Sequence, residues 1–384
     1  MVDQNLYEGR EPAYVKHTFL ERYVRDMLPK VSQFKTFVYV DLFAGPWKSR
    51  CQDYSDTSFG IALSQMAEAK KVQKRLGREV RMVAHLVEKD AHEELKAAVS
   101  KFSGIDEIHV HAGTAEHFAP KIANSMPRDC FRFVVIDPKG LPDMRKFQCL
   151  VAPDRTEVLI NFMFEFANRF AHTDRLPKLE AWLSELNADN NWKAELSELK
   201  GDDRERFITR LATNALAAMG KYRYAPWITV DESEVDRSLY KLIYLSRHPA
   251  GMSVFRDAQF QALSRQSAMR SNMKIARTGQ AGLFDKPGEA DPFERSGQLI
   301  ERERQSAEHV AYEVIKEAGS AGILWEKLWP QVLELWLIRR TELAQTITQW
   351  QKQGRIKIEG WGPKRRSARD GDLIRFAGPS KSIA

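Results

Sequence analysis

The most informative stretch of this chain is Tyr39-Val40-Asp41-Leu42-Phe43-Ala44-Gly45-Pro46. The run from Phe37 to Phe43 is short and, apart from Asp41, β-branched, aromatic or otherwise apolar. Such a run predicts a strand that is buried in a parallel sheet. Ala44-Gly45-Pro46 ends the strand immediately. Because open parallel sheets bind ligands at the carboxyl ends of their strands, the loop that begins at Asp41 is a candidate binding site.

Strand-like and helix-like segments alternate through the first 165 residues. Apolar periodicity predicts helices over residues 12–29, 57–74, 91–102 and 115–125. Short apolar runs predict further strands over residues 80–87, 107–111, 131–136 and 157–162. This alternation predicts an α/β domain with a parallel sheet and helices on both faces.

Two consecutive strands, over residues 227–230 and 239–245, follow without a helix between them. Residues 166–222, which precede them, are charge-rich with helical patterning and predict a helical insertion or cover. A terminal pair with one antiparallel strand is typical of class I methyltransferases that use S-adenosylmethionine, and not of dehydrogenase Rossmann domains. We therefore expect a Rossmann-like class I methyltransferase domain over residues 1–275.

The C-terminal part of the chain has a different pattern. Residues 276–294 are polar and punctuated by glycine and proline, which predicts a linker. Helices are predicted over residues 295–317, 323–336 and 339–351, and strands over residues 354–360 and 372–376. Three helices and a two-stranded ribbon are typical of a winged helix-turn-helix, so we expect such a domain over residues 295–384.

Composition restricts the class of protein. The 384 residues suit two domains, and no apolar run reaches the 18 residues or so that a membrane span needs. The N-terminus is polar and lacks the pattern of a signal peptide, so we expect a cytoplasmic protein without membrane contact. Three widely spaced cysteines disfavour a disulfide framework or a zinc ribbon. The net charge of +7 favours polyanionic partners.

The strand ends carry polar residues in a repeated arrangement: Asp41, Glu88, Thr114 and Asp137. Asp41 is expected to order its loop or to meet the amino group of a ligand, and Gly45 lets the backbone approach that ligand closely. Phe43 belongs to the same expected cofactor site. Glu88 suits the two hydroxyls of a ribose, because a carboxylate accepts both hydrogen bonds. Each acid alone is explained as well by capping of the next helix, but the joint pattern favours a cofactor that contains a nucleoside.

The first loop indicates which cofactor to expect. It has one glycine, and Trp47 stands where a second glycine often falls, so the chain lacks G-x-G-x-x-G. A dinucleotide needs tight glycines against its phosphates. S-adenosylmethionine has no phosphate and is compatible with a single-glycine loop.

The loop after the fourth strand, Asp137-Pro138-Lys139-Gly140, is the candidate catalytic segment. A D-P-P-Y type loop at this place would present a carbonyl and an aromatic face to an exocyclic amine and position it for in-line methyl transfer. Here Lys139 and Gly140 replace the second proline and the aromatic residue, which disfavours direct methylation of a base amine. The alternative is a turn that ends the strand. We take Asp137, Pro138 and Lys139 as the catalytic candidates.

Six stretches carry a resemblance to a known family: Tyr14-Val15-Lys16-His17, Tyr39-Val40-Asp41-Leu42-Phe43-Ala44-Gly45-Pro46-Trp47, Asp56-Thr57-Ser58-Phe59-Gly60-Ile61-Ala62-Leu63, Ile136-Asp137-Pro138-Lys139-Gly140, Leu159-Ile160-Asn161-Phe162 and His248-Pro249-Ala250-Gly251. Together they resemble the three-Cys-motif partner (TcmP) family through most of the chain, winged-helix tail included. The resemblance implies a methyltransferase-like fold in a bacterial or mobile-element setting. It also implies a radical-SAM-like partner protein with three clustered cysteines, and it implies no established reaction.

Lys16-His17 also resembles a Lys-His pair near the N-terminus of certain rRNA adenine methyltransferases, where it closes over the cofactor site. The resemblance implies that Lys16 meets a substrate phosphate or the cofactor carboxylate and that His17 orients it. The alternative is a solvated helix start. His109 and His111 alternate on one strand, but a metal site needs a third ligand that the sequence does not identify, so we expect a structural role and no metal.

The C-terminal domain carries the candidate nucleic-acid residues: Arg339, Arg340, Arg355, Lys364, Arg365, Arg366 and Arg369. Arg339 and Arg340 begin the third helix, where a recognition helix meets bases. The others lie in or near the ribbon, beside Lys357 and Trp361, with Glu359 as the one acid before Asp370. Such a ribbon suits phosphate contact with base stacking, on DNA or RNA. The alternatives are a solvated face or a protein-binding module.

Three functions compete at this point. The first is S-adenosylmethionine-dependent methyl transfer to nucleic acid, which Asp41, Glu88 and Asp137 favour. The second is a non-catalytic module with a methyltransferase fold that supports its partner on nucleic acid, which Trp47, Lys139 and Gly140 favour. The third, an NAD-dependent oxidoreductase, disagrees with the glycine loop and the paired terminal strands. The first is preferred.

Overall fold

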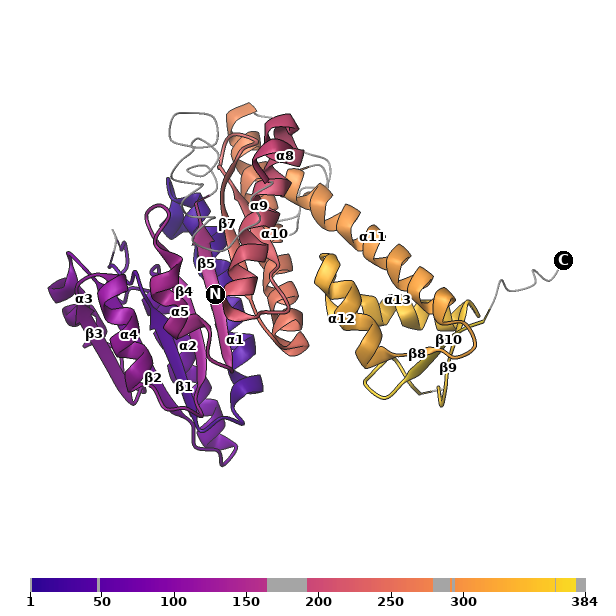
Figure 1. The fold of residues 1–384 in the computed structure, drawn as a ribbon, viewed down its shortest axis with the longest axis horizontal. Helices are drawn as coiled ribbons and strands as arrows, with labels where there is room; N and C mark the ends of the chain where they lie inside the picture. The colour runs from indigo at the N-terminus through magenta and orange to yellow at the C-terminus, as the bar shows by residue number, and fades with distance from the viewer. Residues whose placement is uncertain are drawn as a thin grey trace. The chain divides into compact units, whose positions relative to one another are not determined.

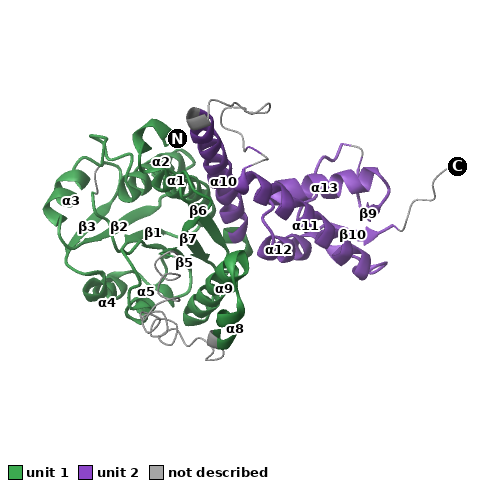
Figure 2. Cartoon of the chain, turned by 90° about the horizontal axis from the view of Figure 1, so that it is seen from above, with its two compact units in different colours: residues 1–251 green, residues 252–384 purple. Residues whose placement is uncertain are grey.

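The computed structural model describes residues 2–46, 49–163, 192–278, 291, 294–362 and 364–377. The chain divides into two compact units, Met1–Gly251 and Met252–Ala384 (Figure 2). The expected domain boundary at residue 275 falls inside a long helix, α10 (Pro249–Thr278). The expected linker, residues 276–294, therefore begins within that helix, and most of the remainder lies outside the described residues.

The first unit is built on a seven-stranded sheet with the order β3-β2-β1-β4-β5-β7-β6 (Figure 1). Its strands are β1 (Thr36–Asp41), β2 (Arg81–Glu88), β3 (Glu107–Ala112), β4 (Phe131–Ile136), β5 (Thr156–Phe162), β6 (Trp227–Asp231) and β7 (Ser238–Leu245). Strands β1 to β5 are parallel, and β7 runs antiparallel to both of its neighbours. The prediction of an α/β, Rossmann-like sheet with one antiparallel strand in a terminal pair is confirmed.

Helices cover both faces of this sheet (Figure 2). They are α1 (Glu11–Val31), α2 (Ser58–Arg75), α3 (His92–Val99), α4 (Ala115–Ser125), α5 (Gln148–Val151), α8 (Trp192–Glu198) and α9 (Gly201–Gly220), with short 3-10 turns at Gln4–Tyr7 and Met144–Phe147. On one face, Tyr23 of α1 packs against Phe133 of β4. The opposite face, which includes Val134, packs against α4, α5, α8 and α9 in one apolar core.

The predicted helices are confirmed with small shifts in their ends. Thr57 is the N-cap of α2, and its side chain accepts a hydrogen bond from the N–H of Gly60, as its position before the apolar run predicts. α3 is shorter than expected and ends at Val99, because the N–H groups of Lys101 and Phe102 bond the carbonyls three residues back and so leave the α-helical pattern. Of the predicted insertion, residues 192–222 are largely helical as expected, whereas residues 166–191 lie outside the described part.

The second unit contains, after α10, helices α11 (Arg295–Ala318), α12 (Trp325–Leu335) and α13 (Arg340–Lys352). Its sheet has three antiparallel strands in the order β8-β10-β9: β8 (Ile323–Leu324), β9 (Ile356–Ile358) and β10 (Leu373–Phe376). The expected helix over 323–336 is thus wrong in its first turn, because Ile323 and Leu324 pair with β10 instead. A core of buried side chains joins these elements, and it includes Trp325, Leu328, Ile347, Ile358 and Ile374. Among the helices of the described residues, none is long and apolar enough to cross a bilayer.

Candidate functional site

A cavity of about 1030 Å³ opens in the first unit where β1 to β5 reach their carboxyl ends. Every predicted site residue of this unit lines it except Asp41: Lys16, His17, Phe43, Gly45, Glu88, Thr114, Asp137, Pro138 and Lys139. Strand-end loops of a parallel sheet meet along one edge, which explains why residues over a hundred positions apart converge. The cavity is also of the size that ligand sites have.

Asp41 lies beneath the cavity and is fully buried. Its Oδ1 accepts a hydrogen bond from the N–H of Phe43 (3.0 Å), and its Oδ2 accepts from Ser58 Oγ (2.8 Å) and Tyr39 Oη (3.2 Å). Burial raises the pKa of this carboxyl to about 6, although the three donors oppose that rise. Of its two expected roles, Asp41 therefore has the contacts to order the loop after β1, and it does not reach the cavity surface.

Glu88 and Thr114 combine capping with exposure to the cavity. Glu88 Oε1 accepts from the N–H groups of Asp90 (2.9 Å) and Ala91 (3.0 Å), which fixes the start of the segment that leads into α3. Within the described residues Glu88 Oε2 accepts no hydrogen bond, so this oxygen is available to a ligand. Thr114 Oγ1 accepts from the N–H of His117 (3.3 Å) and caps α4. Both side chains therefore accept hydrogen bonds from the N–H groups that precede or begin the next helix, as the capping alternative predicts. Both also line the cavity.

Asp137 is held between two donors from different elements. Lys16 of α1 donates from Nζ to Oδ2 (2.5 Å), and Asn161 at the end of β5 donates from Nδ2 to Oδ1 (2.6 Å). Burial raises the pKa of Asp137, but the charge of Lys16 and these two hydrogen bonds outweigh it, so the pKa lies below its usual value. The ammonium of Lys16 is thus engaged with Asp137, while Lys139 is exposed and Pro138 is buried.

His17 is buried and its Nδ1 is 2.9 Å from Tyr7 Oη. Burial lowers the pKa of His17 to about 3, and the neighbouring charge of Lys16 adds to this effect. The imidazole is therefore neutral at pH 7. The alternative of a solvated helix start does not hold for His17, because its ring is packed inside the unit at the wall of the cavity.

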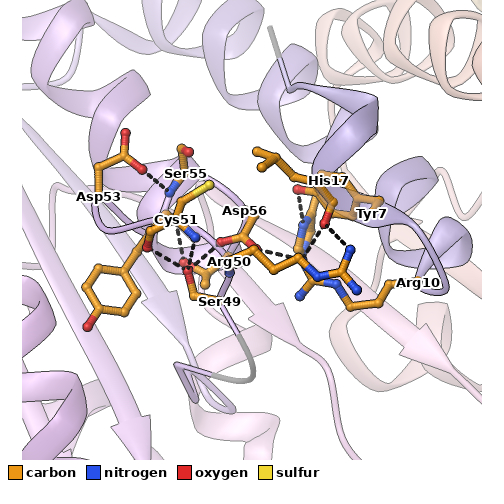
Figure 3. Close-up of polar contacts among 12 residues, drawn as sticks. Tyr7, Arg10, His17, Ser49, Arg50, Cys51, Asp53, Ser55 and Asp56 are labelled. Carbon is orange, nitrogen blue, oxygen red and sulfur yellow. Dashed lines mark hydrogen bonds and ion pairs between the residues drawn. The ribbon is translucent and has the colours of Figure 1, made fainter.

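A polar cluster around Asp56 forms another wall of the cavity and was not assigned from the sequence (Figure 3). Arg10 Nη2 donates to Asp56 Oδ2 (2.6 Å), and so does the N–H of Arg50 (2.9 Å). Ser49 Oγ donates to Asp56 Oδ1 (2.5 Å). Burial raises the pKa of Asp56, but these donors outweigh burial and lower it overall. The cluster ties the start of α1 to the loop that precedes α2.

Three histidines gather at the edge of the sheet. His85 of β2 lies opposite His109 of β3, and its Nδ1 is 3.1 Å from His111 Nε2. The rings are stacked, with His85 4.8 Å from His109 and 5.4 Å from His111 between ring centres. Over the described ranges, no group of three or more histidine, cysteine, aspartate or glutamate side chains is arranged to hold a metal ion. Strand pairing supplies the third histidine that the sequence did not identify.

The second unit engages four of the seven predicted nucleic-acid residues in internal contacts. Arg339 pairs with Glu342 (2.8 Å) and lies 4.0 Å from the centre of the Phe260 ring. Arg340 pairs with Asp370 (2.6 Å) and lies 4.5 Å from the Trp329 ring.

The other two engaged residues are in or near the ribbon. Arg355 lies 4.3 Å from the Tyr312 ring, and Arg365 binds the buried carboxylate of Asp372. By contrast, the side chains of Lys364, Arg366 and Arg369 are exposed.

No protein-family model matches this chain, and no curated protein matches it either. The resemblance to the TcmP family is therefore carried by the quoted motifs alone. The site has to be interpreted from its own geometry.

Proposed function

We propose that the first unit is a methyltransferase-like domain that binds S-adenosylmethionine in this cavity, and that the protein acts on or with nucleic acid. In this proposal the second unit is a winged helix-turn-helix that holds the nucleic acid, and a radical-SAM-like protein with three clustered cysteines is the partner, as the TcmP resemblance implies. The observation that carries the proposal is the convergence of nine predicted site residues on one cavity at the strand ends.

The donor set fits this cofactor. Glu88 lines the cavity, its Oε2 accepts no hydrogen bond from the described residues, and two ribose hydroxyls suit a carboxylate. Asp41 fixes the single-glycine loop through the N–H of Phe43, which leaves Phe43 and Gly45 at the cavity wall. S-adenosylmethionine supplies an electrophilic methyl group when it is bound. The residues of this chain contribute binding, through Glu88 and the loop, and a fixed carboxylate at Asp137.

The strand arrangement supports the same proposal. A terminal pair in which β7 alone is antiparallel is typical of class I methyltransferase sheets, and β7 has this direction. The loop after β1 lacks the glycines that the phosphates of a dinucleotide need, which disfavours a dinucleotide as the cofactor. The alternation, the terminal pair and the loop therefore point to one class of cofactor.

Calorimetry of the purified full chain with S-adenosylmethionine and S-adenosylhomocysteine tests the cofactor site. Micromolar binding is expected, with loss in Asp41→Ala because the loop loses its anchor. Glu88→Gln retains one oxygen for the capping N–H groups and removes the charge, so it is expected to weaken binding about tenfold or more. Glu116→Gln, on α4 at the same cavity, is the matched control and is expected to bind normally. Absence of binding at millimolar ligand, with and without nucleic acid, would overturn the proposal.

A second candidate is a non-catalytic module with the same fold, and two observations favour it. Both oxygens of Asp137 are already bonded within the protein, by Lys16 and Asn161, and the loop 138–140 contributes no aromatic face to the cavity. Transfer of a labelled methyl group to DNA, RNA or the partner protein distinguishes the two candidates. Cofactor binding without any transfer, alongside nucleic-acid binding, would favour the module.

A further inference from the structure

The ribbon of the second unit has a large excess of basic residues. Between residues 352 and 376 the chain has eight basic and three acidic residues. Each of the acids is already bonded within the unit: Glu359 to Arg375 (2.8 Å), Asp370 to Arg340 (2.6 Å), and Asp372 to Arg365. Two of the eight basic residues, Arg365 and Arg375, are thus paired with acids of the segment, and within the described residues the three acids form no ion pair with the other six.

A hollow of about 670 Å³ collects part of this excess, and its lining is Lys352, Lys364, Arg365 and Arg366. We call it the basic notch. Lys352 is the last residue of α13, and the other three come from the loop between β9 and β10. No acidic or aromatic side chain of the described residues lines the notch.

The loop that supplies three of these cations is held by contacts along its length. Asp372, which is buried, accepts from Arg365 Nη2 and from the N–H of Arg369 (2.9 Å). The N–H of Arg365 donates to the carbonyl of Gly362 (3.0 Å), and Ala368 is buried. Because its backbone is anchored, the loop presents Lys364 and Arg366 to solvent beside Lys352 at little cost in ordering.

We propose that the basic notch binds the phosphate backbone of a nucleic acid and supplies the main electrostatic contacts of the second unit. This inference rests on the nucleic-acid part of the proposed function. It assigns phosphate contact to Lys352, Lys364 and Arg366, and not to Arg339 and Arg340, whose charges are matched by Glu342 and Asp370. A lining of cations alone has no group that accepts from a base amine or stacks on a base, which favours contact with phosphates, so we expect binding with little dependence on sequence.

The lining favours nucleic acid over an acidic peptide. Peptides gain most of their affinity from a few buried apolar or aromatic anchors, and among the described residues no apolar side chain lines the notch to receive one. Phosphates need no such anchor, because release of counterions drives their binding. The ring of Trp361 is also covered on one side by Arg365, 5.1 Å away, which reduces its use as a platform for an unstacked base.

Fluorescence anisotropy with the full chain tests the proposal. The probes are labelled DNA and RNA duplexes of two unrelated sequences, titrated over a range of salt. The notch variant carries Lys352→Ala, Lys364→Ala and Arg366→Ala. The matched control carries Arg302→Ala, Lys316→Ala and Lys327→Ala, three exposed cations of α11 and α12. The notch variant is expected to bind about tenfold or more weakly. The slope of log K against log salt is expected to decrease in magnitude by about two to three in this variant and to stay unchanged in the control.

The outcomes separate the inference from the function on which it rests. If the unaltered chain binds neither duplex, the nucleic-acid part of the function fails before any variant is compared. If it binds and the notch variant keeps both affinity and slope, the notch inference is overturned and the function stands. A clear sequence preference, or tighter binding of a poly-glutamate peptide than of a duplex at equal salt, also overturns it. Lys364→Gln with Arg366→Gln repeats the test if the triple variant unfolds at a lower temperature.

Discussion

Lys16 Nζ and Asp137 Oδ2 are 2.5 Å apart, although 121 residues separate them in the chain. Their side chains are about one-fifth exposed, 19% and 21%, so solvent screens the pair only in part. Asn161 completes the arrangement from the other side of the carboxylate. The central acid of the candidate site is therefore an oriented, ionised group whose two oxygens are both engaged.

Substitution Lys16→Met is expected to raise the pKa of Asp137 above its usual value. Burial raises this pKa, and after the substitution, of the two hydrogen bonds that oppose burial, only the one from Asn161 remains. In the unaltered chain the lowered pKa adds stability above the unfolded value near 4, and this stability is lost as the pH falls through the lowered value. In the variant the sign reverses, so unfolding becomes easier as the pH rises through the raised pKa. NMR titration of labelled aspartate carboxyls measures the shift.

Lys89→Met is the control for this prediction. Lys89 also lines the cavity, but it is exposed. An unchanged pKa of Asp137 in Lys16→Met, or an equal shift in both variants, would contradict the assigned role of the ion pair.

His17 is expected to make the unfolding free energy fall in acid. Its pKa is about 3 in the folded chain and about 6.5 when unfolded, so between these values only the unfolded chain takes up the proton. Each pH unit below 6.5 then costs about 1.4 kcal/mol. His17→Gln, which keeps a partner for Tyr7, should remove this slope between pH 6 and pH 4. Urea unfolding across that range measures it.

His85 sets the baseline for the same experiment, since burial lowers its pKa to about 3 as well. In the unaltered chain both histidines contribute to the fall of the unfolding free energy with decreasing pH, whereas in His17→Gln only His85 does. The slope from these two groups should therefore be about twice as large in the unaltered chain. At pH 8 the two proteins should differ only through the lost imidazole contacts. Equal slopes in acid would show that His17 takes up its proton in the folded state.

Gly251→Ala is expected to destabilise the first unit by about 1–3 kcal/mol. A Cβ at this position would lie 2.1 Å from Glu157 Oε1 and 2.4 Å from Tyr244 Oη. Glu157 is buried and receives hydrogen bonds from Tyr23 and Ser246 (3.1 Å to Ser246), so it has no room to withdraw. Thermal unfolding measures the loss. Gly362→Ala, where the added atom meets nothing within 4 Å, is the control and should be neutral.

Arg365→Ala is expected to change the stability of the second unit, whereas Arg366→Ala is expected to change its binding of nucleic acid. Removal of Arg365 leaves the carboxylate of Asp372, 8% exposed, without its ionic partner, which should cost the second unit about 3–5 kcal/mol. Removal of the exposed Arg366 should leave stability within about 0.5 kcal/mol and lower the salt slope of nucleic-acid binding by about one. Thermal unfolding and anisotropy are measured on both variants. A stable Arg365→Ala protein would contradict the structural role of that arginine.

Much of the first unit could be predicted from the sequence, because most of its strands are short, mainly apolar runs with recognisable turns at their ends. The run over 131–136 has the same bounds in the structure. The two-residue strand β8 could not be separated from the following helix, since Ile323 and Leu324 continue its apolar pattern.

The cavity residues that stand at strand ends could be predicted from the sequence, whereas those that meet only through tertiary packing could not. Glu88 and Asp137 stand directly at strand ends, so their convergence follows from a parallel sheet. Arg10 meets Asp56 only because α1 and α2 pack together, and His85 meets His109 only through the register of β2 and β3. Charge alone also gave no sign that Arg340 is matched by Asp370, thirty residues farther along.

The strand order also governs the chain while it is being synthesised. β5 is complete at Phe162, but its second neighbour, β7, begins only at Ser238. A nascent chain between these two lengths carries an apolar strand whose edge amides and carbonyls lack a partner, and such edges recruit other chains. β6 is made earlier than β7, but in the finished sheet it pairs with β7 and not with β5, so it is not the final partner of that edge. We therefore expect the unfinished chain on the ribosome to be more prone to aggregation than the finished protein.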